Sequence, residues 1–295
     1  MLAQRRNRKI EWMTKTPAID IRIWGARGTF PIPGSDTLEF GGHTCCVEVR
    51  AGGRVLIFDA GSGIVPLGQA LTDEAVTEID LFFSHAHYDH IIGLPYFPPA
   101  FCDRTKLRIW AGHMLDNSTP EAMVAGIFRP PYFPISKDQM RAEIEYRQFS
   151  PGDVLNPVAG VQLQTGALNH PNGAVGYRLE TAGASFAYLT DFEHDGGSGD
   201  ATIQRLARNA DLALLDATYT PQEYPRFAGF GHSTWDKCGA LCAKAGVKRW
   251  GMFHHMHLRT DGEQRVIETA AQAVYPNTFA VRQGQRIALP KLAAT

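Results

Sequence analysis

The hydrophobic residues of this chain are spaced in two ways, and the spacing changes along its length. Short apolar runs, typical of strands, dominate the first two thirds, whereas in the last third they alternate with amphipathic stretches typical of helices, as in βαβ units. Strands are predicted at 19–24, 45–49, 54–58, 79–83, 107–110, 161–165, 175–180, 185–189, 212–215 and 247–253. Helices are predicted at 119–127, 200–210, 234–245 and 261–274, followed by a closing hairpin at 278–289.

This alternation predicts an α/β fold in which helices cover a sheet. The 295 residues, of which 44% are hydrophobic and 20% charged, suffice for one large domain with a sizeable core. We therefore expect a single domain over residues 19–295. Residues 1–18 are rich in Arg and Lys and lack the apolar stretch of a signal sequence or membrane anchor, so they are expected to form a flexible basic tail.

Charge and cysteine content narrow the functional classes. The formal net charge of -1 gives no global reason to expect binding to nucleic acid or to an acidic membrane, so an anionic substrate would need a local field. The five cysteines have no zinc-ribbon or disulfide spacing, and a reducing cytoplasm is the simplest location. Cys238 and Cys242 lie one helical turn apart and could form a ligand or redox pair, although buried small apolar residues are the favoured interpretation.

The strongest chemical signal follows the predicted strand at 79–83. His85, His87, Asp89 and His90 place three imidazoles and a carboxylate within six residues. In extended backbone His85 and His87 point to the same side, while Asp89 and His90 can face a neighbouring position. Mixed nitrogen and oxygen donors suit Zn, Mn or Fe better than Ca or Mg. The segment thus offers ligands for two ions; a metal-free, histidine-rich surface turn is disfavoured by its place at a strand end.

The spacing H-x-H-x-D-H at residues 85–90 is the signature of the metallo-β-lactamase superfamily, which the chain resembles over about residues 19–289. The resemblance implies an αββα sandwich, two mixed β-sheets flanked by helices, with a two-metal site at one edge. It implies that the first ion is held by His85, His87 and His170, the second by Asp89, His90 and His254, with Asp191 bridging them. Taken alone, His170 would more often be a surface histidine and Asp191 a helix or turn cap.

Two further motifs narrow the branch of the superfamily. The segments 216–219 (Asp-Ala-Thr-Tyr) and 231–234 (Gly-His-Ser-Thr) are similar to paired motifs of the tRNase Z, PhnP-like and cyclic-nucleotide phosphodiesterase branch, in which this histidine faces the scissile phosphate. His232 also stands just before a predicted helix, whose free N–H groups favour an anion. The chain lacks a recognisable Gly-rich, basic arm for tRNA, so tRNA processing is not expected.

Other residues are expected to support the site. In the resembled family an Asp at the position of Asp59 orients a ligand imidazole, and Asp216 is expected in a similar supporting role. The candidate substrate contacts are His43, Tyr132 and His257. Tyr132 belongs to a segment rich in Pro and aromatic residues, 94–135, which would line the metals or, as readily, pack on the core. His255 lies close enough to His254 to leave its own membership of the site open.

We therefore expect a dinuclear metal-dependent hydrolase, in the first place a phosphodiesterase that acts through a metal-bridging hydroxide. Asp89 and His232 are the expected catalytic residues, with His232 binding a phosphoryl oxygen or protonating the leaving group. The cofactors would be two divalent metal ions per chain, zinc first, with manganese or iron open. The substrate would be a small-molecule or nucleotide-type phosphodiester. Nucleic acid is expected only as a substrate, no membrane partner is expected, and a homodimer is left open.

Two other functions compete with this one. The same metals could serve an acyl hydrolase, such as a lactonase, thioesterase or β-lactamase-like enzyme, but the motifs around Asp216 and His232 favour phosphate. A non-catalytic, metal-stabilised regulatory module is the second alternative. The full ligand set argues against it, because structural zinc sites are closed and usually rich in cysteine. A redox di-iron enzyme is also less favoured than a hydrolase.

Overall fold

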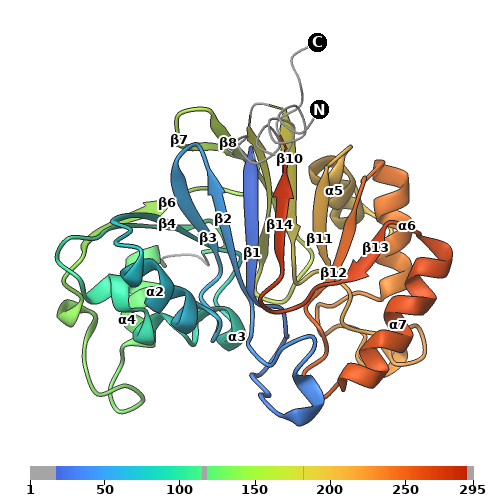
Figure 1. Cartoon of the computed structure of the whole chain (residues 1–295), viewed down its shortest axis with the longest axis horizontal. Coiled ribbons are helices and arrows are strands. Elements are labelled where there is room, and N and C mark those ends of the chain that lie inside the picture. Colours follow the sequence, from blue (N-terminus) through green and yellow to red (C-terminus); the bar gives the residue numbers. More distant parts are fainter. Residues whose placement is uncertain (1–17, 115–117, 182, 291–295) are drawn as a thin grey trace, which may run out of the picture.

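The computed structural model describes residues 18–114, 118–181 and 183–290, in two β-sheets that pack face to face with helices on their outer sides (Figure 1). Each sheet has seven strands and mixes parallel with antiparallel pairs. The predicted αββα sandwich is therefore confirmed. The basic segment at residues 1–17 lies outside the described residues.

The two sheets divide the chain into halves. The first sheet contains, in spatial order, β14 (Arg286–Leu289), β1 (Ile19–Gly25), β2 (Cys46–Ala51), β3 (Arg54–Phe58), β4 (Glu78–Phe83), β5 (Lys106–Ala111) and β6 (Glu143–Gln148). The second contains β13 (Thr278–Ala280), β12 (Trp250–Phe253), β11 (Leu212–Asp216), β10 (Ala184–Leu189), β9 (Ala174–Thr181), β8 (Val161–Leu168) and β7 (Val154–Val158). Among the strands of the described residues, only β14 returns to the first sheet, where its pairing with β1 ties the C-terminal segment to the N-terminal half.

The helices cover the outer face of each sheet (Figure 1). The α-helices of the first half are α2 (Ile64–Asp73), α3 (Tyr88–Ile91) and α4 (Pro120–Ile127), and those of the second are α5 (Ser198–Ala207), α6 (Trp235–Ala245) and α7 (Asp261–Val274). The 3-10 turns are η1 (Ser35–Thr37), η2 (Leu94–Tyr96), η3 (Pro98–Phe101), η4 (Lys137–Gln139) and η5 (Tyr224–Arg226). Within the described ranges, every helix is too short or too polar to cross a membrane.

Aromatic side chains fill the space between the sheets and hold the strand ends. Phe58, the last residue of β3, stacks on Phe82 of β4 with ring centroids 5.5 Å apart, and it meets Tyr177 and Tyr188 of the opposite sheet at 5.4 and 5.5 Å. All four side chains are fully buried. Burying a side chain of this size contributes about 1.5–3 kcal/mol. Because Asp59 directly follows Phe58, this packing also holds a predicted site residue in place.

Several details of the predicted elements differ from the structure, and α2 was not predicted at all. The closing hairpin predicted at 278–289 is wrong: β13 pairs parallel with β12, whereas β14 pairs antiparallel with β1 in the other sheet. An apolar pattern alone does not distinguish a hairpin from a strand pair that separates between two sheets. β6 and β7 lie outside the predicted strands, because these sheet-edge strands are largely exposed, and β7 contains Pro157, which edge strands tolerate.

Candidate metal centre

Three predicted site residues follow strands and adopt left-handed backbone conformations. Asp59 after β3, Asp191 shortly after β10 and His254 after β12 have φ angles of 62°, 53° and 58°. Such a conformation costs a residue other than glycine about 1–3 kcal/mol and persists only where surrounding structure enforces it. All three are buried, so the neighbouring core and hydrogen bonds hold them. The sharp turns bring side chains from both sheets to one edge of the sandwich.

The first group of donors comprises His85, His87 and His170. One ring nitrogen from each lies within 4.8 Å of the other two. His87 Nδ1 is only 3.0 Å from His170 Nε2, although the two residues belong to different halves of the chain. His85 leaves the end of β4, and His87 precedes the first turn of α3 in extended backbone. The predicted first-ion residues are thus brought together.

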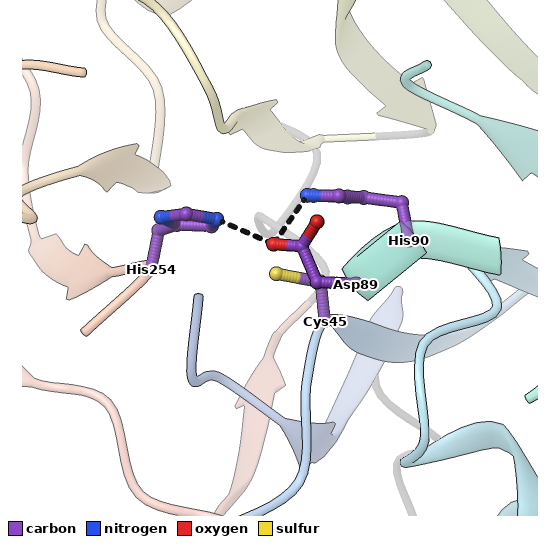
Figure 2. Close-up of side chains that lie close together, drawn as sticks. All are labelled: Cys45, Asp89, His90 and His254. Atoms are coloured by element: carbon purple, nitrogen blue, oxygen red, sulfur yellow. Dashed lines mark hydrogen bonds and ion pairs between the residues drawn. The ribbon is translucent and has the colours of Figure 1, made fainter. Parts of the chain in front are cut away.

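The second group contains Asp89, His90 and His254. Asp89 Oδ2 lies 3.3 Å from His90 Nε2 and 3.1 Å from His254 Nε2. Figure 2 shows that the thiol of Cys45 lies beside this carboxylate, and its sulfur is within 4.8 Å of donors from all three residues. Cys45 was not among the predicted site residues. The only signal in the sequence is the adjacent pair of Cys45 and Cys46, whose side chains must face opposite sides of a strand.

Asp191 lies between the two groups. Its Oδ2 atom is 3.3 Å from both His90 Nε2 and His254 Nε2, 3.7 Å from His85 Nε2 and 3.9 Å from His170 Nε2. One carboxylate therefore faces donors of both groups, which is the position that a bridging ligand requires.

Buried hydrogen bonds orient the imidazoles. Asp59 Oδ2 accepts from His90 Nδ1 at 2.8 Å, and the same carboxylate accepts from the backbone N–H of Ser84 at 2.7 Å and from the hydroxyl of Tyr188 at 2.8 Å. His170 Nδ1 donates to the carbonyl of Gly231 at 2.8 Å. Because each Nδ1–H has an oxygen partner, the lone pair of each Nε2 is directed into the cluster.

The same arrangement holds His254. Its Nδ1 donates to Thr218 Oγ1 at 2.9 Å, which leaves its Nε2 facing Asp89. Thr218 is itself held by Asp216, whose Oδ1 accepts from the Thr218 hydroxyl at 2.9 Å. Two successive hydrogen bonds, through the hydroxyl of Thr218, thus connect Asp216 to the candidate ligand His254.

The donor set suits divalent metal ions. The Nε2 atoms of His85 and His90 are buried and have no hydrogen-bond partner among the described residues, which is costly for a polar atom unless an ion engages it. Burial lowers the pKa of His85 well below its ordinary value, which leaves its imidazole neutral and able to coordinate. Burial also opposes the charged form of His90, but Asp191 and Asp89 outweigh it and raise its pKa well above the usual value. The carboxylates thus give the site an excess of negative charge, which a cation would balance.

His232 forms a dyad with Asp216 beside the cluster. Its Nδ1 donates to Asp216 Oδ2 at 2.7 Å and lies 3.9 Å from Asp191 Oδ2, and its ring stacks on His254 with centroids 4.6 Å apart. Burial lowers the pKa of His232, but the Asp216 carboxylate more than offsets this and raises it to about 9. With Nδ1 engaged by Asp216, Nε2 is the ring nitrogen left to meet a substrate.

The candidate substrate contacts have different surroundings. His43 is partly buried, and its Nδ1 lies 3.0 Å from Ser62 Oγ. His257 is partly exposed, and burial together with the charges of Arg27 and His254 lowers its pKa. Tyr132 is 86% exposed between α4 and η4, and no hydrogen bond or ring contact in the described ranges joins it to the cluster. The structure thus gives Tyr132 no support as a substrate contact.

Besides Cys45, two further side chains near the site were missed by the sequence reasoning. Arg27 donates from Nη1 to the carbonyls of Met256, His257 and Arg259, and so it shapes the loop that follows His254. His255, whose membership of the site was left open, has its Nε2 2.7 Å from the carbonyl of Val281, so this ring nitrogen is engaged outside the donor groups.

The second missed side chain is His113, which follows β5. Both of its ring nitrogens are buried and lack a hydrogen-bond partner among the described residues. Burial, together with the charges of His90 and His87, lowers its pKa to about 4, which indicates that the ring lies near the cluster. His113 has no other candidate metal ligand near it in the sequence, so no motif identified it as a site residue.

Known proteins resemble this chain in sequence and in fold. The family model described as the beta-lactamase superfamily domain matches residues 54–255. A ribonuclease Z from Ignicoccus hospitalis is 27% identical over 246 residues, which cover 72% of this chain and 81% of that protein. Among solved structures, a diphosphatase of the PhnP family has a TM-score of 0.66 at 19% identity, and alignment covers 92% of this chain and 98% of that one. The short form of human tRNase Z has a TM-score of 0.64 at 18% identity, covering 92% and 99%.

The structural neighbours are too distant in sequence to show more than the fold. The family model, in contrast, spans most of the chain and includes β3, the segment from His85 to His90, His170, Asp191 and the last candidate ligand, His254. The family-model match and the two converging donor groups both indicate a metal-dependent hydrolase of this superfamily. The chain belongs to the metallo-β-lactamase superfamily and is a metal-dependent hydrolase.

Proposed function

We propose that the chain is a phosphodiesterase that uses two divalent metal ions, with zinc as the first expectation. The observation that carries this proposal is the His232–Asp216 dyad beside the metal-binding groups, with His232 Nδ1 2.7 Å from Asp216 and 3.9 Å from Asp191. A phosphodiester needs a cation-rich pocket for its oxygens and a proton donor for its leaving oxygen. The names of the relatives, a ribonuclease Z and a PhnP-family diphosphatase, support a phosphoester bond as the target.

The proposed ligand sets follow the two groups. His85, His87 and His170 would hold one ion, Asp89, His90 and His254 would hold the other, and Asp191 would bridge them. When bound, two such ions supply an acidified water and positive charge for the phosphoryl oxygens. Asp89 would have a second role as acceptor of the water proton. Its Oδ2 is held by the backbone N–H of Thr29 at 2.7 Å, which keeps the carboxylate in one orientation.

His232 would act on the leaving side of the substrate. Asp216 holds its Nδ1–H, so Nε2 would donate a hydrogen bond to a phosphoryl oxygen or a proton to the departing alkoxide. The segment that carries His232 is also tied to the first donor group, because His170 donates to the carbonyl of Gly231. The proton donor and the ligands would therefore keep their relative positions during turnover.

The proposed substrate is a small-molecule or nucleotide-type phosphodiester. The formal net charge of -1 offers no global attraction for a polyanion, so the ions themselves would supply the field that holds phosphate. Nucleic acid enters the proposal only as a substrate of this site.

The deciding experiment measures metal content together with hydrolysis of bis(p-nitrophenyl) phosphate, and compares it with panels of lactones, thioesters and β-lactams. The variants are Asp191→Ala and, as a control, Asp103→Ala. The control removes an exposed carboxylate in the turn between η3 and β5, outside the donor groups. We expect diester cleavage with roughly two ions per chain in the wild type and the control, and its loss in Asp191→Ala. Metal-dependent activity on acyl substrates alone would overturn the phosphodiesterase proposal and leave the fold and the donor groups unaffected.

A further inference from the structure

We propose that Cys45 is a thiolate ligand of the second metal ion, alongside Asp89, His90 and His254. This inference rests on the two-ion site proposed above. Sγ of Cys45 and one donor atom from each of the other three residues all lie within 4.8 Å of one another. In Figure 2 the sulfur lies next to the Asp89 carboxylate, with His90 and His254 directed toward that carboxylate from either side. The four side chains thus surround one position.

The strand explains why this cysteine, and not its neighbour, faces the site. Cys46 is the first residue of β2 and pairs with Gly25 of β1. Its side chain packs in the apolar cluster on the outer side of the first sheet, with Ile57 and Leu81. Because successive side chains of an extended chain point to opposite faces, Cys45 points inward. The carbonyl of Cys45 also accepts from the backbone N–H of Gly61, which holds the residue in position.

The surroundings of the sulfur indicate a metal ligand and not merely a side chain that packs in the core. The thiol is fully buried, and its hydrogen-bond acceptor is the carbonyl of Arg27, at 3.6 Å. Independently, His90 Nε2 is fully buried and has no hydrogen-bond partner in the described ranges, although its Nδ1 is held by Asp59. A buried imidazole nitrogen without a partner, next to a weakly held thiol and a carboxylate, is the arrangement that a metal ion would satisfy.

A sulfur ligand would change the chemistry of the second ion in two ways. Thiolate is a soft donor that favours zinc and disfavours manganese or magnesium, so the second site would select zinc more strongly than the first. The thiolate would also reduce the formal positive surplus of the centre by one charge. A centre of lower charge suits a singly charged diester better than a doubly charged phosphomonoester, which sharpens the proposed substrate class.

The test replaces zinc by cobalt and records the near-ultraviolet band that a cobalt–thiolate bond produces. It uses the wild type, Cys45→Ser and, as a matched control, Cys46→Ser, which alters an equally buried cysteine on the opposite face. We expect the band in the wild type and in Cys46→Ser but not in Cys45→Ser. Competition with a chelator should also show affinity for one of the two ions lowered at least roughly tenfold in Cys45→Ser, as for the loss of other groups around a metal.

X-ray absorption at the zinc edge of the wild type provides a second measurement that needs no variant. It should detect one sulfur neighbour at about 2.3 Å from part of the zinc. No sulfur neighbour in a wild type loaded with two ions would overturn the role of Cys45 while leaving the phosphodiesterase proposal intact. A sulfur neighbour in a protein without diesterase activity would support the role of Cys45 and overturn the phosphodiesterase proposal. An unchanged cobalt band in Cys45→Ser would also overturn the assignment.

Discussion

The backbone of Gly28 lies directly against the imidazole of His254: a Cβ atom at Gly28 would come 2.1 Å from His254 Cε1. The Gly28 N–H donates to the carbonyl of His255, so the loop that carries Gly28 cannot move away from His254 independently. A side chain at position 28 must therefore displace the last candidate ligand. This contact joins the loop after β1 to the end of β12, two segments that are far apart in the sequence.

Gly28→Ala should lower turnover about a hundredfold, since a displacement of about 1 Å at a catalytic group has an effect of that size. Gly34→Ala is the matched control, because nothing lies within 4 Å of a Cβ at that position. Steady-state kinetics and metal content of both variants check the prediction. Wild-type turnover in Gly28→Ala would show that His254 is not needed in its present position.

Asp59→Asn should weaken metal binding as well as stability. The change removes the charge that faces His90 and turns one acceptor of the buried network into a donor. We expect the free energy of unfolding to fall by about 1–3 kcal/mol and metal affinity to fall about 10–100-fold. Urea denaturation of the metal-free protein and chelator competition measure the two effects separately.

Asp80→Asn is a suitable control for that variant. Asp80 is also fully buried and accepts from Trp110 Nε1 at 2.9 Å and from Arg54 Nη1 at 3.1 Å, but it lies on β4, outside the donor groups. Asp80→Asn should therefore lower stability and leave metal affinity unchanged. Equal losses of affinity in the two variants would mean that Asp59 acts through general stability and not by orienting His90.

The site could be predicted from sequence to the extent that its residues are local or follow a familiar motif. His85 to His90 are nearly consecutive and follow an apolar strand, so local geometry already indicates a metal site. His170, Asp191 and His254 are isolated in the sequence, and only the resemblance to a family singled them out. In the structure, the left-handed turns at Asp191 and His254 bring them together, and no local pattern predicts those turns.

The remaining site residues depend on packing that a sequence pattern does not carry. A cysteine at the start of a strand is usually core, and only the register of β2 with β1 and β3 turns Cys45 toward the donors. Arginine is rarely buried, yet Arg27 is 1% exposed because three carbonyls of one loop surround its guanidinium. Strand and helix periodicity indicated the α/β class, and the family resemblance supplied the two-sheet sandwich, whereas neither predicted the edge strands β6 and β7.

His232→Ala should separate the roles of proton donation and general binding. If His232 protonates the leaving oxygen, its loss should reduce hydrolysis of alkyl phosphodiesters about 10²–10⁴-fold. Hydrolysis of bis(p-nitrophenyl) phosphate should fall far less, since p-nitrophenolate leaves without a proton. The two substrates act as internal controls for one protein preparation. Similar reductions for both substrates would argue for a role in binding the phosphoryl group instead.

Glu193→Gln should disturb both His232 and His170 through one surface segment. The Glu193 carboxylate accepts from the backbone N–H groups of Gly229 at 2.8 Å and Gly231 at 3.0 Å, and also from the hydroxyl of Tyr224. Gly231 in turn accepts from His170 and precedes His232. An amide in place of the carboxylate turns an N–H group toward these donors, which weakens bonds that are stronger than ordinary ones because the acceptor is charged.

We expect kcat of Glu193→Gln to fall roughly tenfold, which corresponds to about 1.4 kcal/mol in the activation free energy when two site residues are less well positioned. Metal affinity of the first site should also fall, and the melting temperature should stay nearly unchanged. Glu180→Gln is the control, since Glu180 on β9 pairs with Arg178 away from the donors. A large drop in melting temperature with unchanged kcat in Glu193→Gln would show that the contact serves the fold alone. Parallel losses of kcat and of first-site metal affinity would instead identify Glu193 as the residue that aligns the proton donor with the ligands.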